Sequence, residues 1–141
     1  MIVYPDTSFL VPLYLWDRHT PKAQQQMGQR PFVVFTPFHR AELAHALYQH
    51  VFRRQISPDE ARIAYANFEK DLDSGVLVAT GQPERTYLTC VELARRHTAT
   101  LGVRTLDSLH VAAALELRAD RFWTFDDRQK KLAEVEGLAT V

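Results

Sequence analysis

The sequence is short of cysteine, glycine and excess charge, and each shortage excludes something. Cys90 is the single cysteine, so no disulfide can form within the chain, and we expect a reducing compartment, the cytoplasm. The five glycines are scattered and form no Walker or dinucleotide-binding loop. Lysine plus arginine and aspartate plus glutamate both number 17, so no global field attracts polyanions.

Long apolar runs are also missing. No stretch approaches 18 uninterrupted apolar residues, and the start of the chain, Met1–Asp6, has no basic segment of the kind that opens a secretory signal. The remaining composition, 46% hydrophobic and 24% charged, is that of an ordinary globular protein. A length of 141 residues suits one domain, so we expect residues 1–141 to fold as a soluble single domain.

Short apolar segments alternate with helical patterns along the chain. Strands are predicted at 2–4, 32–35, 76–79, 122–125 and 138–141. Helices are predicted at 7–16, 20–28, 37–54, 57–74, 83–101, 105–118 and 127–134. Thr36, Ser57 and Thr105 are expected to cap three of these helices. This alternation predicts a three-layer α/β/α domain with a short parallel sheet and a large helical share.

Four acidic residues are predicted to gather at the carboxyl edge of that sheet. Asp6 and Asp126 directly follow two strands, and Glu42 and Asp107 lie in the first turns of two helices. Two carboxylates about 4 Å apart repel by about 4 kcal/mol at an effective dielectric constant of 20, so such a cluster needs protons or cations. With only oxygen ligands, the natural cation is Mg²⁺ or Mn²⁺, which activates water for attack on a phosphoryl group.

Each of these acids also has a purely structural interpretation. Asp6 and Asp126 could cap helices, the latter in a capping box with Gln129. Glu42 and Asp107 could be favoured by the helix dipole, which is worth about 0.3–1 kcal/mol. Spacing alone does not separate these roles from catalysis.

The histidines and the cysteine give weaker signals. His39, His45 and His50 are spaced by six and five residues, whereas a helical zinc pair needs three or four. His110 falls one turn after Asp107 and could hydrogen-bond it or the acidic site. Cys90 shares a helical face with apolar residues, which indicates core packing.

Four segments, taken together, resemble the PIN-domain nucleases. They span positions 6 to 129 in the family's order and each contains one of the four acids: Asp6-Thr7-Ser8, Phe38–Leu43, Leu106–Ala114 and Thr124–Gln129. The third segment is the most specific, because an acid followed by a histidine and an alanine-rich helix is a particular pattern. Length and layout are similar to VapC-type toxins, the ribonuclease halves of toxin–antitoxin pairs.

The resemblance implies an Mg²⁺- or Mn²⁺-dependent endoribonuclease that forms a homodimer and is inhibited by a cognate antitoxin. Carried over residue by residue, it assigns both catalysis and metal binding to Asp6, Glu42, Asp107 and Asp126. It also leads us to expect a hydroxyl of Thr7 or Ser8 at the metal edge, and Thr124 as a brace for Asp126. Of the arginines, Arg40 and Arg128 adjoin the acids and are the first candidates for contacting RNA.

Two other functions stay open. A phosphatase could use Asp6 as its nucleophile, but that chemistry usually needs a second acid two residues on, where this chain has Ser8, and a supporting lysine late in the chain is not evident. A non-catalytic binding module of the same fold would predict a broken acid set. The Tyr14-Leu15-Trp16 cluster indicates either core packing or a groove for a partner helix.

Overall fold

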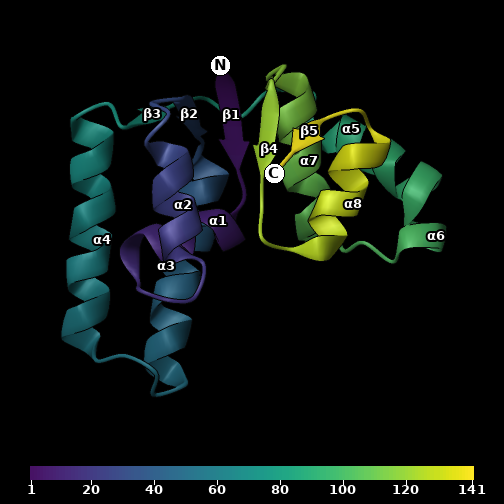
Figure 1. The fold of residues 1–141 in the computed structure, drawn as a ribbon. Coiled ribbons are helices and arrows are strands. Elements are labelled where there is room, and N and C mark those ends of the chain that lie inside the picture. Colours follow the sequence, from purple (N-terminus) through teal and green to yellow (C-terminus); the bar gives the residue numbers. More distant parts are fainter.

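A parallel sheet runs through the centre of the molecule, with helices on both of its faces (Figure 1). The computed structural model describes residues 1–141, and its strands lie in the order β3-β2-β1-β4-β5. They are β1 (Ile2–Pro5), β2 (Phe32–Phe35), β3 (Leu77–Ala79), β4 (Arg121–Trp123) and β5 (Ala139–Thr140). Because every pairing is parallel, all five strands end at the same edge of the sheet.

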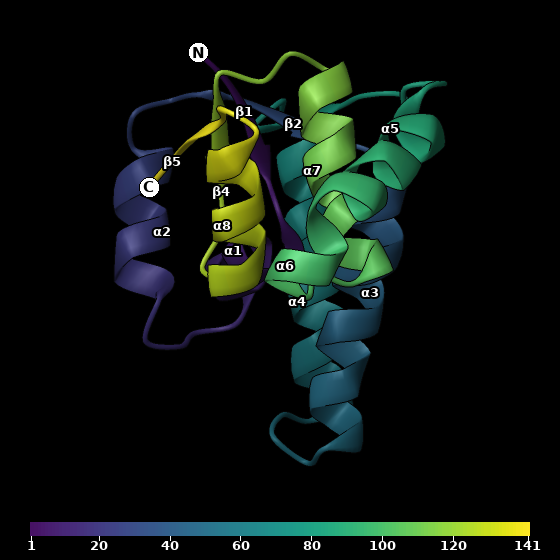
Figure 2. The same ribbon diagram turned by 90° about the vertical axis from the view of Figure 1, so that its right-hand side faces the viewer.

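The helices divide between the two faces, which confirms the predicted three-layer α/β/α fold. One side carries α1 (Thr7–Tyr14), α2 (Thr20–Met27), α3 (Pro37–Phe52) and α4 (Pro58–Asp73). The other side carries α5 (Thr86–Leu93), α6 (Ala99–Leu101), α7 (Thr105–Glu116) and α8 (Asp127–Val135). In Figure 2, α3 and α4 project as an antiparallel pair beyond the sheet.

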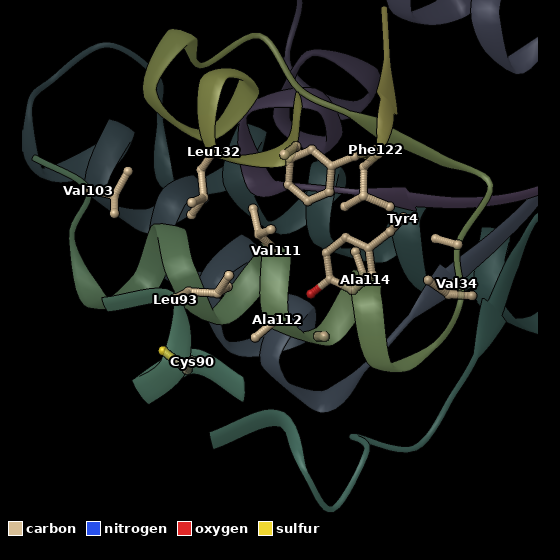
Figure 3. Packing of buried hydrophobic residues seen from close by; sticks show 14 residues of the cluster. Tyr4, Val34, Cys90, Leu93, Val103, Val111, Ala112, Ala114, Phe122 and Leu132 are labelled. Atoms are coloured by element: carbon tan, nitrogen blue, oxygen red, sulfur yellow. The ribbon is translucent and has the colours of Figure 1, made fainter. Parts of the chain in front are cut away.

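Alternating strand side chains build a separate core on each face. Tyr4 and Phe122 point toward α5, α7 and α8, where their rings stack beside the buried alanines Ala112–Ala114 of α7 (Figure 3). Val3 and Trp123, their neighbours in the chain, pack on the opposite face with α1 and α2. Burial on both faces explains why the strands are apolar throughout rather than alternating with polar residues.

The segment predicted as one helix over 83–101 is interrupted. It consists of α5, a π-helical turn η1 (Ala94–Thr98) and α6, and it ends at Gly102, whose φ of 66° lies in the left-handed region.

The predicted cap at Thr105 is wrong. The N-cap residue of α7 is Arg104, because the Asp107 carboxylate accepts the Arg104 backbone N–H at 3.1 Å. That bond places Thr105 inside the first turn, where its hydroxyl has no capping role.

The Tyr14-Leu15-Trp16 cluster is split between core and surface. The Tyr14 hydroxyl donates to Asp71 of α4 at 2.7 Å, and Leu15 packs against the core beside α3 and α4. Trp16 is 77% exposed. Separately, none of the helices combines the length and the apolarity needed to cross a membrane.

Candidate active site

Asp6 occupies the end of the central strand, where it caps α1. Its side chain is fully buried, and its Oδ1 accepts the Phe9 N–H at 3.0 Å and the Ser8 hydroxyl at 2.7 Å. Oδ2 accepts the Thr124 hydroxyl at 2.5 Å. Burial raises the pKa of the Asp6 carboxyl, and this effect outweighs the nearby His110 and the three hydrogen bonds, all of which lower it.

Thr124 joins the ends of two neighbouring strands. Besides donating to Asp6, its hydroxyl oxygen accepts the backbone N–H of Asp126 at 2.9 Å and lies 3.2 Å from Ser8 Oγ. Ser8 Oγ in turn accepts the Phe125 N–H at 2.9 Å. The expected contact between Thr124 and Asp126 is therefore present, through the backbone of Asp126, and it extends to Asp6.

Glu42, on α3, is tied to both neighbouring elements of the edge. Its Oε1 accepts the Thr7 hydroxyl of α1 at 2.7 Å and contacts Nε2 of His110 from α7. The pKa of the Glu42 carboxyl is lowered. Burial raises it, but the hydrogen bond and charge of His110, together with the hydrogen bond from Thr7, lower it by more. Of the two contacts anticipated for His110, the structure has the one to the acidic site.

Tyr4, on β1, contacts His110 from the side of the sheet. Its hydroxyl lies 3.0 Å from His110 Nδ1, although 106 residues separate them in the chain. Tyr4 is fully buried, and burial followed by the charges of Asp6 and Glu42 raises the pKa of its phenol well above the usual value. Both carboxylates are thus close enough to Tyr4 to influence it.

His39 has a structural role in the site that the sequence analysis, which considered it only as a zinc ligand, did not predict. It occupies the third position of α3, where its Nδ1 accepts the Thr36 N–H at 2.9 Å, as a glutamate does in a capping box. Because a backbone N–H can only donate, Nδ1 is unprotonated, and Nε2–H donates to the Pro5 carbonyl at 2.7 Å. Burial, then the nearby His110, lower the pKa of His39 to about 3.

Asp107 and Asp126 each serve a helix start. Asp107 Oδ2 accepts the Arg104 N–H and lies 3.5 Å from Arg104 Nε. Asp126 Oδ1 accepts the Gln129 N–H at 2.9 Å, as the cap of α8. The predicted capping box at Asp126 is only half formed, because the Gln129 side chain does not return to the Asp126 backbone and its Oε1 is buried without a partner.

The four acids therefore share one edge of the sheet but not one network. Hydroxyls of the consecutive residues Thr7 and Ser8 contact Glu42 and Asp6, so both acids are bound to the first turn of α1. Neither Asp107 nor Asp126 is joined to them by a carboxylate contact, and no three acidic, histidine or cysteine side chains surround a common metal position. A cavity of about 470 Å³ opens beside Glu42 and Thr7, with Leu106 of α7 in its wall.

Of the remaining histidines, His45 lines the cavity beside Glu42 and is close enough to help lower the pKa of Glu42. His45 and His50 hydrogen-bond the backbone carbonyls of Ala41 and Ala46, one turn earlier on α3. Cys90 is buried, as predicted, and burial raises the pKa of its thiol.

Comparisons with known proteins agree with this fold. VapC20 of Mycobacterium tuberculosis, described as a toxin cleaving the sarcin–ricin loop, superposes with a TM-score of 0.72 at 18% identity, covering 99% of this chain and 98% of that one. VapBC2 from Rickettsia felis, bound to a promoter DNA fragment, has a TM-score of 0.71 at 15% identity, covering 100% and 98%. FitAcB from Neisseria gonorrhoeae has a TM-score of 0.70 at 15% identity, covering 99% and 96%.

No curated protein matches the sequence significantly. The sequence model of the PIN domain does match, over residues 3–135, which include all four acids of the edge. This chain therefore belongs to the PIN-domain family.

Proposed function

We propose that the chain is a metal-dependent endoribonuclease and acts as the toxin of a toxin–antitoxin pair. One observation carries the proposal: the PIN match over residues 3–135 spans an intact set of four acids at the carboxyl edge of the sheet. Nuclease chemistry is the general activity of this family. The structural relatives support the toxin role, since one of them is itself described as an RNA-cleaving toxin.

The donor chemistry of the edge fits a hard divalent cation. Glu42, Asp107 and Asp126 each have one carboxylate oxygen engaged in hydrogen bonds and a second oxygen that makes none. Asp6 is a buried carboxylate whose raised pKa reflects the cost of burying its charge, and a cation offsets that cost. With oxygen ligands alone, we propose Mg²⁺ or Mn²⁺, held by Asp6, Glu42, Asp107 and Asp126.

When bound, such a cation polarises a phosphoryl oxygen and lowers the pKa of a water molecule. The protein's own part is to aim the carboxylates. Ser8 and Thr124 fix the Asp6 carboxylate, while Thr7 binds that of Glu42. The cavity beside Glu42 offers space for an RNA strand at this edge.

The two arginines expected at RNA differ in their surroundings. The Arg40 guanidinium lies over the Phe68 ring, 5.6 Å from its centroid, and 4.0 Å from Glu69, so it is engaged with α4. Arg128 is exposed and forms no ion pair. Arg128 is therefore our first candidate for a phosphate contact next to Asp126.

The protein partners follow from the same proposal. We propose a cognate antitoxin, supported by the similarity to VapBC2, and a homodimer of the chain itself. Because the net charge is zero, apolar contacts rather than electrostatic attraction should dominate antitoxin binding. Expression of this chain alone should be toxic in its own host, and co-expression with the neighbouring gene should relieve the toxicity. Harmless strong expression of the wild-type chain would contradict the toxin role.

Cleavage of structured RNA in Mn²⁺ or Mg²⁺ tests the catalytic proposal. Purified protein should cleave the RNA, and excess EDTA should stop it. Asp107→Asn should abolish cleavage although asparagine can still accept the Arg104 N–H, so its unfolding temperature should stay close to that of the wild type. Undiminished cleavage in EDTA would contradict the metal mechanism.

The geometry disfavours both alternatives that the sequence left open. As a phosphatase nucleophile, Asp6 would need an accessible oxygen, but it is fully buried and both of its oxygens accept hydrogen bonds. The residue two positions on, Ser8, donates to Asp6 rather than serving as an acid or base. A non-catalytic module would not need three acids, Glu42, Asp107 and Asp126, that each keep one carboxylate oxygen without a hydrogen bond.

A further inference from the structure

His110 lies between a buried phenol and a half-buried carboxylate. On one side of its ring, Nδ1 is 3.0 Å from the Tyr4 hydroxyl, and on the other, Nε2 contacts Glu42 Oε1. The His110 and Tyr4 side chains have almost no solvent exposure. Nothing in the cleavage chemistry proposed above uses either residue, so their arrangement needs its own explanation.

The donors and acceptors of these side chains show which His110 nitrogen carries the hydrogen shared with Glu42. An ionised carboxylate only accepts, so the His110 nitrogen facing Glu42 carries the hydrogen. On the other side of the ring, Nδ1 and the Tyr4 hydroxyl share a hydrogen bond of 3.0 Å. His39, whose ring centroid lies 4.5 Å from that of Tyr4 and 5.4 Å from that of His110, also carries its hydrogen on Nε2, as its bonds to Thr36 and Pro5 require.

The direction of these bonds has a consequence for Glu42. Thr7 and His110 both bind Oε1, from α1 and α7, and they leave Oε2 without a hydrogen bond. A carboxylate held at one oxygen by two donors from different elements cannot rotate freely, so its other oxygen has a fixed position. Groups that orient a metal ligand in this way typically change metal affinity or activity 10- to 100-fold when they are mutated.

From these contacts we infer that His110 is a positioning residue for Glu42, and that Tyr4 holds the His110 ring in its orientation. The inference rests on the proposed function, because it concerns how Glu42 is presented to a divalent cation. It adds two residues, one from β1 and one from α7, to the machinery of the acidic edge.

Two substitutions of His110 test the contacts of its two ring nitrogens separately. The amide of glutamine lies near the position of Nε2, so His110→Gln keeps a donor for Glu42 and loses the link to Tyr4. The amide of asparagine lies near Nδ1, so His110→Asn has the opposite effect. Tyr4→Phe removes only the hydroxyl and keeps the ring that stacks on Phe122. His50→Gln, at a histidine whose ring hydrogen-bonds the Ala46 carbonyl, is the matched control.

Calorimetric titration with Mn²⁺ gives the first readout. Relative to wild type, we expect affinity to fall about 10- to 100-fold in His110→Asn and clearly less in His110→Gln, with no change in His50→Gln. Equal affinity of wild type and His110→Asn would overturn the inference and leave the proposed function standing. A wild-type chain that binds neither Mn²⁺ nor Mg²⁺ would overturn the proposed function and, with it, the role of His110 toward a cation.

Nitrogen NMR of the metal-free protein gives a second readout that needs no cation. The wild type should show His110 protonated at Nε2, and Tyr4→Phe should shift its Nδ1 signal, since that nitrogen loses its hydrogen-bond partner. If the His110 variants fail to fold, the same measurement on the nearly isosteric Tyr4→Phe variant still tests the inference. A Nδ1 signal that Tyr4→Phe leaves unmoved, or a ring protonated at Nδ1 alone, would contradict the assignment.

Discussion

The Thr124 hydroxyl donates to Asp6 Oδ2 at 2.5 Å and so joins the ends of two adjacent strands that are 118 residues apart in the chain. The same oxygen accepts the Asp126 N–H, which means that one hydroxyl orders one acid and the backbone of another. Two of the four acids of this edge therefore depend on a single uncharged side chain.

Thr124→Val should destabilise the protein and impair the site. Valine has the shape of threonine without its hydroxyl, so Asp6 loses a donor and the Asp126 N–H loses its acceptor. Leaving such groups unpaired costs about 1–3 kcal/mol, which urea unfolding will measure. Thr124→Ser keeps the hydroxyl and is the control. Equal stability of the valine and serine variants would show that the hydroxyl contributes nothing.

Asp6→Asn should abolish cleavage without lowering stability. The native pKa of Asp6 lies above its unfolded value, so its contribution to stability is greatest at low pH and is lost as pH rises through the native pKa. Asparagine cannot ionise and avoids that loss. With chelator present at pH 7, the unfolding temperature should be equal to or above that of wild type. A marked decrease would mean that Asp6 serves mainly as the cap of α1.

His39→Gln should make the free energy of unfolding depend less on pH under acidic conditions. The native pKa of His39 is about 3, against about 6.5 in an unfolded chain. Between these values the unfolded state binds a proton that the native state does not, so acidification favours unfolding by up to about 1.4 kcal/mol per pH unit. Above about pH 6.5 this dependence vanishes.

Chemical unfolding at several pH values between 4 and 7 measures the effect. Glutamine can still accept the Thr36 N–H but does not titrate. The wild type should therefore lose unfolding free energy relative to the variant as pH falls. His45→Gln, at an exposed histidine of the same helix, is the comparison. A difference that is constant over this pH range would refute the assignment of His39 as a buried neutral residue.

Asp126→Asn and Asp127→Asn should have opposite outcomes for the metal. Asp126 has one oxygen on the Gln129 N–H and one free, whereas Asp127 is exposed in the first turn of α8. Asparagine remains a good N-cap, so Asp126→Asn should lose Mn²⁺ affinity and cleavage with little change in unfolding temperature. Asp127→Asn should keep both. The assignment fails if Asp127→Asn is the variant that loses metal and activity.

Local chemistry made much of the fold predictable. The Ser57-Pro58 start of α4 has a reciprocal capping box with Glu60, and β2 begins and ends where its apolar run does. Each of these signals lies within a few residues. The prediction that Thr105 caps α7 was wrong for an equally local reason. Asp107 stands three residues after Arg104, and an acid at that position stabilises a helix whose cap is Arg104, whatever hydroxyl follows.

The contacts within the site were less accessible from sequence. Tyr4 read only as an apolar strand residue, and nothing near it indicates that its hydroxyl meets a histidine on α7. Topology could place the acids at one edge, but it could not show that Glu42 pairs with His110 while Asp107 turns to Arg104. Which partner each acid contacts depends on side chains that meet from different helices and strands. The periodicity of the sequence carries no information about such contacts.

The strand order also determines when this edge can exist during synthesis. β1 is made first, yet its neighbours in the sheet are β2 and β4, and β4 follows more than a hundred residues later. Until β4 and the residues after it have left the ribosome, Asp6 lacks Thr124, and Asp126 cannot join the edge. A nascent chain is therefore an incomplete nuclease for most of its translation. Contacts between such distant segments also form slowly. For a nuclease directed at RNA, this delay separates the ribosome that makes the chain from the completed site.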